Sequence, residues 1–479
     1  MGSSVSFNDL KAAVHGKTAA IRLRAKLGAV DGDGGKVFPP TYAGGVYAVE
    51  NRRVDGQIRR CVLLDSVQSQ ANRMEEVLQD AFLPSWREMP TGGDAPASDL
   101  PVVAVHVENH GWITSLTAPH RIHDAILRDS NLDGTRFRES DIGAAIVRSR
   151  VWDATALYRY CPTALLFGTW DSTAGEGLDS AKIPRAVVSE IIGIDMNPGV
   201  RTGSRIDPLG IKAQAATIYR RTDSDWALQT DEGGWIGADG GDIDTDSKNN
   251  PRKFGKGRPS DINHGNVTPD LSRFGDRREV QNQHLDQLPD ILRDDPVSLS
   301  YEVRARDGEL RSHGKLDSRF TEILPHAVRP GGVTLNYALH TWTLSLTQLR
   351  RLRFPISGNH EDARNKAART VLAALALYAR ALQQDNGYWL RSRCELIPDN
   401  DVELEFIGAE GGTFRIGTAE EMKQLLDEAL QDASNPGWEQ RVIRLTPTEK
   451  LAELVRRNDA RQVNEGSESE EATSASAED

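Results

Sequence analysis

The stretch Thr18–Leu27 reads TAAIRLRAKL and alternates apolar with basic side chains. The basic positions are Arg22, Arg24 and Lys26, each followed by an apolar residue. A period of two is that of a β-strand, in which successive side chains point to opposite faces of a sheet. The stretch therefore predicts a half-buried strand with one apolar and one basic face. We call the three basic side chains the basic ridge.

The chain that follows predicts a hairpin and then a helix. Residues 46–64 contain an Asp55-Gly56 pair, which is a strong signal for a tight β-turn. The next segment, VLLDSVQSQANRMEEVLQDAF, has apolar residues at helical spacing and ends at about Phe82. Asp65 or Ser66 can cap this helix, because both residue types accept hydrogen bonds from the free N–H groups of a first turn.

Further along, strand and helix signals come without a regular βαβ alternation. We expect strands over Pro101–Val107, Leu165–Trp170 and Ile183–Met196, and a helix over residues 120–152. The segment VTLNYALHTWTLSLTQLRRLRFP predicts a strand that ends in a helical turn, and a long helix follows over Glu361–Gln384. Two late helices carry capping boxes, Thr418 with Glu421 and Thr446 with Glu449. Irregular mixing of strands and helices favours the α+β class.

The composition indicates a globular chain without a membrane span. Its 479 residues carry a net charge of −12, and no apolar run approaches the ~18–20 residues that cross a bilayer. Three widely spaced cysteines exclude a disulfide framework, and no export signal opens the chain, so we expect a cytoplasmic protein. We expect one domain over residues 1–464 and a disordered acidic tail over 465–479. Residues 222–280 are rich in Gly, Asp and basic residues and predict a functional loop.

Known catalytic motifs are missing from the sequence, which has no P-loop, no G-x-S-x-G and no dinucleotide fingerprint. His106, Glu108 and His110 share one face if the segment is a strand, and such a set can bind zinc or manganese. Polar residues at the end of a strand are the simpler interpretation, and we expect no cofactor.

Four clusters of basic residues point to nucleic acid instead. The basic ridge can follow a phosphate backbone, and the predicted helix start offers Ser66, Gln68, Ser69, Asn72 and Arg73 as donors. The segment 248–264 combines cations with the rings of Phe254 and His264, a pairing that suits single-stranded nucleic acid. The fourth cluster is Arg350, Arg351 and Arg353. Each cluster alone is also typical of a solvated face.

Four segments resemble a known family: VLLDSVQSQANRMEE, FGTWDSTAGEGLDSAKIPRAVVSEIIG, KGRPSDINHGN and GGVTLNYALHTWTLSLTQLRRLRFP. They are similar, in this order, to the backbone subunit of the type I-G (formerly I-U) CRISPR Cascade surveillance complex, a member of the RAMP superfamily. The resemblance covers roughly residues 18–400. It implies an RRM-like, ferredoxin-type palm with large insertions, described as fingers and a thumb. It also implies copies that assemble side by side on one CRISPR RNA, which then pairs with target DNA.

The resemblance assigns RNA contacts to particular residues. From the strand and helix these are Arg22, Arg24, Ser66, Gln68, Ser69, Asn72 and Arg73, beside Lys26 of the ridge. The GTWDS block adds Trp170 and Ser172, with Lys182 and Arg185 close in sequence. The segment Lys253–His264 is the candidate thumb, with Lys253, Lys256, Arg258 and His264 as contacts.

The predicted function is therefore non-catalytic binding of CRISPR RNA in an antiviral ribonucleoprotein. The expected partners are the CRISPR RNA, target DNA through the guide, further copies of the chain and other Cascade subunits. Two alternatives stay open. One is a metal-dependent ribonuclease of the RAMP superfamily that uses His106, Glu108, His110 or loop aspartates. The other is a structural subunit that polymerises without RNA.

Overall fold

The computed structural model divides the chain into two compact units. Unit 1 comprises Met1–Val200, Ser298–His313 and Arg319–Ala452, and unit 2 comprises Arg201–Val297, Gly314–Ser318 and Glu453–Asp479. The structure describes residues 3–42, 46–92, 97–171, 182–199, 217–222, 226–230, 233–237, 242–256, 301–305, 310–313, 320–324, 327–328, 331–356, 362–400, 402–408 and 411–459.

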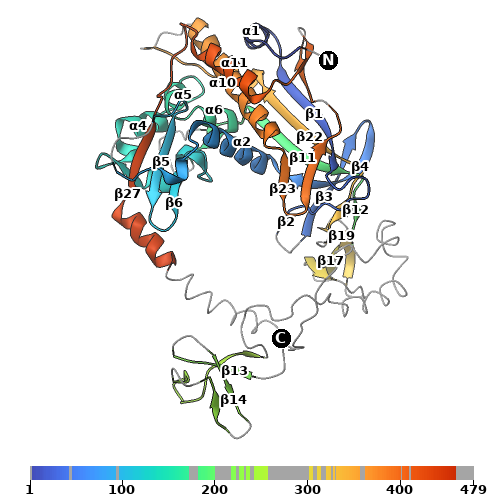
Figure 1. Cartoon of the computed structure of the whole chain (residues 1–479), viewed down its shortest axis with the longest axis vertical. Helices are drawn as coiled ribbons and strands as arrows, with labels where there is room; N and C mark the ends of the chain where they lie inside the picture. Colours follow the sequence, from blue (N-terminus) through green and yellow to red (C-terminus); the bar gives the residue numbers. More distant parts are fainter. Residues whose placement is uncertain are drawn as a thin grey trace. The chain divides into compact units, whose positions relative to one another are not determined.

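Unit 1 is built on a curled antiparallel sheet with the strand order β2-β3-β4-β11-β22-β1-β24-β23 (Figure 1). The bounds are β1 Ala20–Ala29, β2 Thr41–Tyr42, β3 Val46–Val54, β4 Gln57–Asp65, β11 Val187–Ile194, β22 Tyr337–Ser345, β23 Tyr388–Arg391 and β24 Cys394–Pro398. A ribbon of β25 (Glu403–Ile407) and β26 (Gly412–Arg415) also pairs with β1. The first half of β1 pairs with β25 and its end pairs with β24.

The alternation of apolar and basic residues in TAAIRLRAKL determines which side chains of β1 are buried in this sheet. Its apolar side chains are buried, whereas Arg24 and Lys26 are exposed and Arg22 is half-buried. The strand predicted from the alternation is confirmed. The hairpin is confirmed too, since Asp55 (φ 48°) and Gly56 (φ 80°) adopt the left-handed conformations of a tight turn between β3 and β4.

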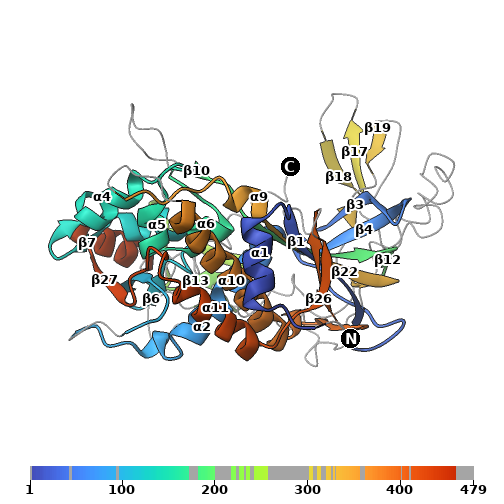
Figure 2. The same cartoon turned by 90° about the horizontal axis from the view of Figure 1, so that it is seen from above.

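Four helices cover one face of the sheet: α1 (Phe7–His15), α2 (Val67–Phe82), α10 (Asp362–Asp385) and α11 (Ala419–Leu430). The long α10 packs against the other three, and Figure 2 shows it beside α11. Neighbours on several sides explain why α10 is buried almost all round from Ala367 to Ala381. The capping box of Thr418 with Glu421 forms as expected at the start of α11.

A second sheet in unit 1 has the strand order β6-β5-β27-β7-β8. It contains β5 (Val102–Val107), β6 (Gly111–Thr114), β7 (Ser130–Leu132), β8 (Thr135–Arg136) and β27 (Val442–Pro447). Its only parallel pair among the described strands joins β27 to β5, so the C-terminal part of unit 1 completes a sheet begun more than 300 residues earlier. These sheets and helices make the chain a mixed α/β protein compatible with the α+β class.

Unit 2 contains a small antiparallel sheet of β13 (Thr217–Arg220), β14 (Trp226–Gln229), β15 (Trp235–Ile236) and β16 (Lys253–Lys256). The rings of Tyr219 and Trp235 meet edge to face with centroids 4.9 Å apart, and Ala227 is fully buried. Part of the segment 222–280 that the sequence suggested as a loop or thumb therefore forms strands. Residues 257–280 lie outside the described residues, as does the tail 465–479.

Three expectations for local structure were wrong. Residues 120–152 form short helices, including α3 (Ala125–Arg128) and α4 (Asp141–Val147), and the strands β7 and β8. The reason is that Asp133-Gly134 and Ser140 interrupt the helical pattern with a turn and a cap. Leu165 lies in the helix α6 (Thr163–Phe167), and only β9 (Thr169–Trp170) is extended. The last helix, residues 449–459, begins after Thr448, since Thr446 still belongs to β27.

The described residues include no helix long and apolar enough to cross a membrane. The three cysteines, Cys61, Cys161 and Cys394, are buried free thiols, which agrees with the absence of a disulfide framework.

Candidate nucleic-acid interface

The start of α2 is organised by Ser66 and Asp65, which follow each other at the end of β4. Ser66 is the N-cap, and its hydroxyl accepts a hydrogen bond from the backbone N–H of Ser69 at 3.2 Å. This settles which of the two possible residues caps the helix. Asp65 does not cap the helix, and its side chain is completely buried.

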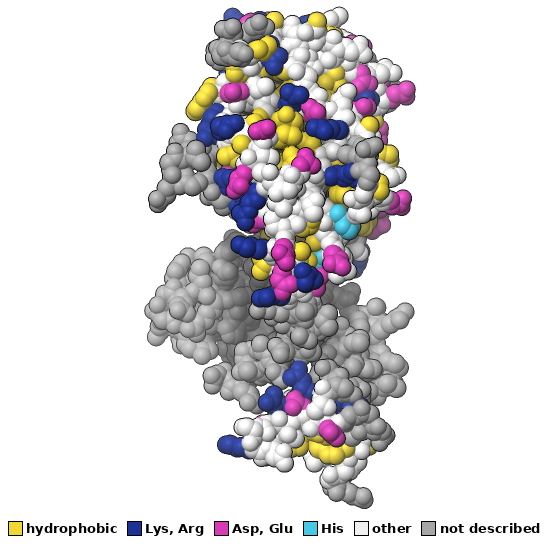
Figure 3. Space-filling model, turned by 90° about the vertical axis from the view of Figure 1, so that its left-hand side faces the viewer, with side chains coloured by type: hydrophobic (Ala, Val, Ile, Leu, Met, Phe, Trp, Pro, Cys, Tyr) yellow, Lys and Arg dark blue, Asp and Glu magenta, His cyan; other side chains and the backbone are white. Residues whose placement is uncertain are grey.

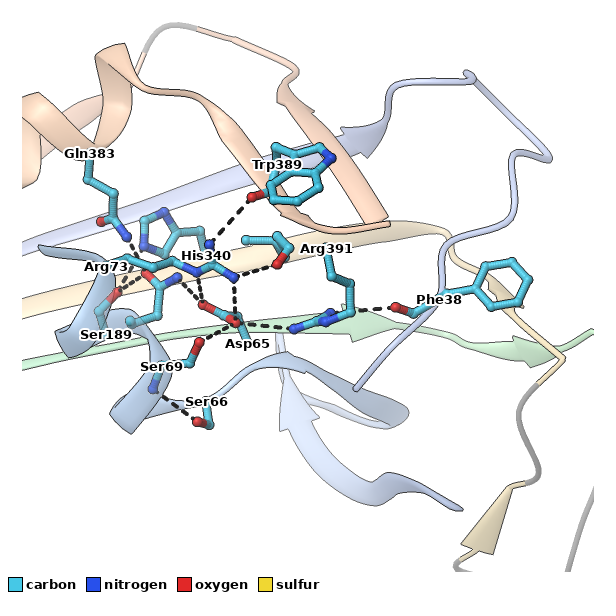
Figure 4. A network of polar contacts seen from close by, with 12 residues as sticks. Phe38, Asp65, Ser66, Ser69, Arg73, Ser189, His340, Gln383, Trp389 and Arg391 are labelled. Atoms are coloured by element: carbon cyan, nitrogen blue, oxygen red, sulfur yellow. Dashed lines mark hydrogen bonds and ion pairs between the residues drawn. The ribbon is translucent and has the colours of Figure 1, made fainter. Parts of the chain in front are cut away.

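Asp65 is the centre of a polar network that joins α2 to a strand from the other end of the sheet (Figure 4). Its carboxylate accepts hydrogen bonds from Ser69 Oγ at 2.8 Å and from Gln70 Nε2 at 2.6 Å. It also accepts from Arg73 Nε at 2.9 Å and from Arg391 Nη2 at 3.3 Å. A buried carboxylate needs such partners to offset its lost hydration. One negative charge is thus shared by two guanidinium groups.

Arg73 also fastens α2 to the edge strand β23. Its Nη2 donates to the backbone oxygen of Leu390 at 2.6 Å, and its Nη1 donates to that of Trp389 at 3.4 Å. The strand order places β4 and β23 far apart in the sheet, so only the curl of the sheet brings Arg391 to Asp65. Gln68 and Asn72 of α2 are exposed and lie one helical turn apart.

The GTWDS block lies beside the same helix end. Trp170 is 58% exposed and pairs across β9 and β10 (Lys182–Ile183) with Lys182, whose Nζ lies 5.6 Å from the ring centroid. Arg185 donates from Nη1 to the backbone oxygen of Val67 at 3.3 Å, within the first turn of α2. Burial lowers the pKa of Arg185, and the nearby Arg121 lowers it further. The predicted Ser172 lies outside the described residues.

The basic ridge lies on the opposite face of the sheet from α2. Ala25 pairs with His340, and His340 shares a hydrogen bond with Ser189, which donates to Gln70 of α2 at 2.9 Å. Ala25 therefore faces α2. Because side chains alternate, Arg22, Arg24 and Lys26 face away from it.

Each ridge cation already has a neighbour. Arg22 pairs with Glu405 of β25, with 2.5 Å between Nη2 and Oε2. Arg24 lies 3.7 Å from a carboxylate oxygen of Asp55, and Lys26 Nζ lies 4.7 Å from the ring centroid of Tyr337. Figure 3 shows the same intermixing elsewhere on unit 1, where basic and acidic side chains alternate around apolar ones.

The predicted thumb contacts belong to unit 2. Lys253 is exposed at the start of β16, and its neighbour Arg252 lies 3.9 Å from a carboxylate oxygen of Asp244. Lys256 ends β16. Arg258 and His264 lie outside the described residues. The predicted contacts thus fall into three groups: the ridge, the start of α2 with the GTWDS block, and unit 2.

Among the described residues there is no candidate site for the metal ion that the ribonuclease alternative requires. No group of three or more His, Cys, Asp or Glu side chains in this part of the chain is arranged to hold a metal ion. His106 instead packs edge to face on Trp112, with ring centroids 5.3 Å apart.

Sequence reasoning missed Asp65 as the centre of the network, and it missed Trp389 and Arg391 entirely. The helix pattern placed Asp65 next to a cap but gave no reason for its burial. The alternation of Tyr388 to Arg391, with Tyr388 and Leu390 buried, was a readable signal for an edge strand. Nothing in the sequence pairs Arg391 with Asp65, 326 positions away.

Residues 21–198 match the model of a family described as "CRISPR-associated protein GSU0053 (Cas_GSU0053)". The match spans less than half of the 479 residues and supports a CRISPR-associated protein. The matched segment contains β1, α2, the GTWDS block and β11, and hence most of the interface described above. No curated protein matches the chain.

Proposed function

We propose that this chain is a non-catalytic subunit that binds CRISPR RNA and forms the backbone of an antiviral type I effector complex. Copies of it line up along one guide RNA and present the guide for pairing with target DNA. The curled sheet with helices on one face is then the RRM-like palm, and unit 2 supplies the thumb. The observation that carries the proposal is the family match, because the matched residues 21–198 hold the clustered donors and cations of α2 and its surroundings.

The character of the clustered side chains supports RNA as the ligand. Trp170 offers an exposed aromatic face beside a lysine, and Gln68 and Asn72 are exposed amides that can bind sugar or phosphate oxygens. A guide differs in sequence from one spacer to the next. A subunit that holds every guide must therefore contact the backbone and stack on bases without reading their identity.

The test is to express the full chain together with a CRISPR array and to purify it. We expect RNA of discrete length to copurify, measured as a raised ratio of absorbance at 260 to 280 nm and as defined bands on a denaturing gel. The matched control is the same chain expressed without the array. Monodisperse filaments free of nucleic acid would overturn the proposal in favour of a protein-only scaffold. A metal ion at unit stoichiometry with cleavage of the RNA would overturn it in favour of a ribonuclease.

A further inference from the structure

The hairpin of β23 and β24, which we call the edge hairpin (Tyr388–Pro398), presents a tryptophan to solvent. Trp389 is 62% exposed, whereas its neighbours Tyr388 and Leu390 are buried. The strand pattern alone accounts for its outward direction. A single exposed apolar side chain needs no functional explanation, so the argument rests on how Trp389 is supported and on what surrounds it.

The backbone behind Trp389 is held from several sides. Arg73 of α2 donates to the backbone oxygens of Trp389 and Leu390. On the buried side, the hydroxyl of Tyr388 accepts from Arg380 Nη2 at 2.6 Å. A ring on a fixed backbone loses little conformational entropy when a ligand stacks on it, which favours binding.

A second aromatic ring lies against the tip of the hairpin. The guanidinium carbon of Arg393 lies 3.9 Å from the ring centroid of Phe38, and the backbone N–H of Phe38 donates to the carbonyl oxygen of Arg393 at 2.9 Å. Arg391 donates from Nη1 to the carbonyl oxygen of Phe38 at 3.5 Å. Figure 4 shows Arg391 between the side chains of Trp389 and Phe38 in that view.

Positive charge is in excess around these two rings. Arg73, Arg391 and Arg393 are offset by Asp65 and by the exposed Glu395, which pairs with Trp389 across the hairpin. Lys36 lies close by, since its side chain and the Phe38 ring both approach Gly332. Aromatic faces together with a cationic excess fit the bases and phosphates of single-stranded nucleic acid.

Another protein strand is a poorer fit to this edge. A strand that extends a sheet needs free backbone acceptors on the edge strand. Two carbonyl groups of β23 already accept hydrogen bonds from Arg73. The rings and charges beside them are therefore better matched by a ligand that stacks than by one that pairs with the strand.

The geometry points to the edge hairpin as a stacking platform for unpaired bases of RNA, with Trp389 as the principal ring and Arg391 and Arg393 near the phosphates. This inference rests on the proposed function and extends the RNA site beyond every residue predicted from the sequence. A tryptophan face stacks on any base, so the platform tolerates variable guides.

The chain provides a matched control for the test. Trp152 is 64% exposed but lies between α4 and α5 (Thr155–Tyr160), away from the edge hairpin. We suggest measuring the binding of fluorescein-labelled oligouridine and oligoadenosine to the full chain and to W389A, W389F and W152A by fluorescence anisotropy. Circular dichroism and the thermal midpoint of each variant report whether it folds.

We expect W389A to raise Kd roughly tenfold for both RNAs, which lies in the lower half of the range for removing one stacked base. W389F should restore most of the affinity, and W152A should behave like the unaltered chain. The slope of log K against log salt should not change in W389A, because no phosphate contact is removed.

Three results would count against the platform. If W389A binds RNA as the unaltered chain does, the inference is wrong while the proposed function stands. If W389A instead changes the oligomeric state of RNA-free protein, measured by light scattering, Trp389 belongs to an interface between copies. If the unaltered chain binds neither RNA, the proposed function fails, and the platform fails with it.

Discussion

The basic ridge and the edge hairpin both present arginines, yet these arginines are paired in different ways. On the ridge, Arg22 and Arg24 each face a carboxylate from another strand or turn, Glu405 and Asp55. At the edge hairpin, Arg73 and Arg391 share the single carboxylate of Asp65, and Arg393 lies over an aromatic ring. A row of cations in a sequence therefore says little about how each cation is paired in the folded protein.

This difference has a consequence for ligand binding. A phosphate that approaches Arg22 must compete with Glu405 for the same guanidinium, whereas Arg393 lies over the ring of Phe38. Surface ion pairs like the one on the ridge contribute little to stability, whereas removing one partner from the half-buried pairs at Asp65 leaves an uncompensated charge and costs more. Changes at the two regions should thus differ in their effects on both folding and binding.

The largest effect is expected from Asp65→Asn. Asparagine removes the charge that Arg73 and Arg391 share and leaves two half-buried cations without their carboxylate. We expect the free energy of unfolding to fall by about 3 kcal/mol, measured by urea denaturation. The matched control is Glu405→Gln on the ridge, for which a loss below about 1 kcal/mol is expected. Equal losses in the two variants would remove the energetic contrast between the regions.

Acidification should lower the stability of the fold without changing the charge of the arginines in the two regions, because arginine side chains stay protonated throughout. Burial lowers the pKa of His123 to about 4. Attraction by Asp171 raises this pKa, and repulsion by Arg138 lowers it. Its folded pKa lies below the value of about 6.5 in the unfolded chain, so only the unfolded chain takes up a proton between these limits. Stability should fall by about 2 kcal/mol between pH 7 and pH 5 from this residue alone.

His340 acts in the same direction, since burial and then Arg380 lower its pKa well below the usual range. The measurement is urea denaturation at pH 7 and pH 5 for the unaltered chain and for His123→Gln, which should show a smaller fall. An increase in stability on acidification would contradict the sign of both shifts.

A medium effect is expected from Arg393→Gln at the tip of the edge hairpin. Loss of this exposed cation should weaken RNA binding roughly fivefold and flatten the slope of log K against log salt by ~0.7 for one lost phosphate contact. Anisotropy titrations across a salt series measure both quantities. An unchanged slope would place Arg393 away from the phosphates.

The smallest effect is expected from Glu405→Gln, and it should be a gain. Removing this carboxylate releases Arg22 for a phosphate and should strengthen RNA binding about twofold with a steeper salt slope. The same titrations apply, with Glu395→Gln as the corresponding change at the edge hairpin. No change in affinity for Glu405→Gln would indicate that the ridge does not face RNA.

Local patterns predicted the elements that depend on near neighbours. The alternation of Arg22 and Arg24 with apolar residues predicted β1, and the turn at Asp55-Gly56 predicted the hairpin of β3 and β4. The prediction failed for residues 120–152, where turns at Asp133-Gly134 and the cap at Ser140 divide a pattern that looked helical. A helical pattern is weak evidence when turn residues interrupt it.

The candidate site was predictable only in part. Ser66 and the exposed Gln68 and Asn72 follow from the helix and its cap, because both are local features. The Glu405 partner of Arg22 lies 383 positions away along the chain, and no local pattern indicates it. Charge balance is a property of neighbours in space, so the sequence listed the cations without their partners.

The sequence by itself determined which side chains of β1 face the core, where α2 begins to within one residue, and that a long helix covers about Glu361–Gln384. The physical reason is that backbone geometry fixes the periods of strand and helix, and caps and turns act within a few residues. Only the tertiary structure decided that Asp65 meets Arg391 and that Trp389 stands exposed beside Arg73. The curl of the sheet brings the edge strand β23 to the start of α2, and that curl results from packing across the whole unit.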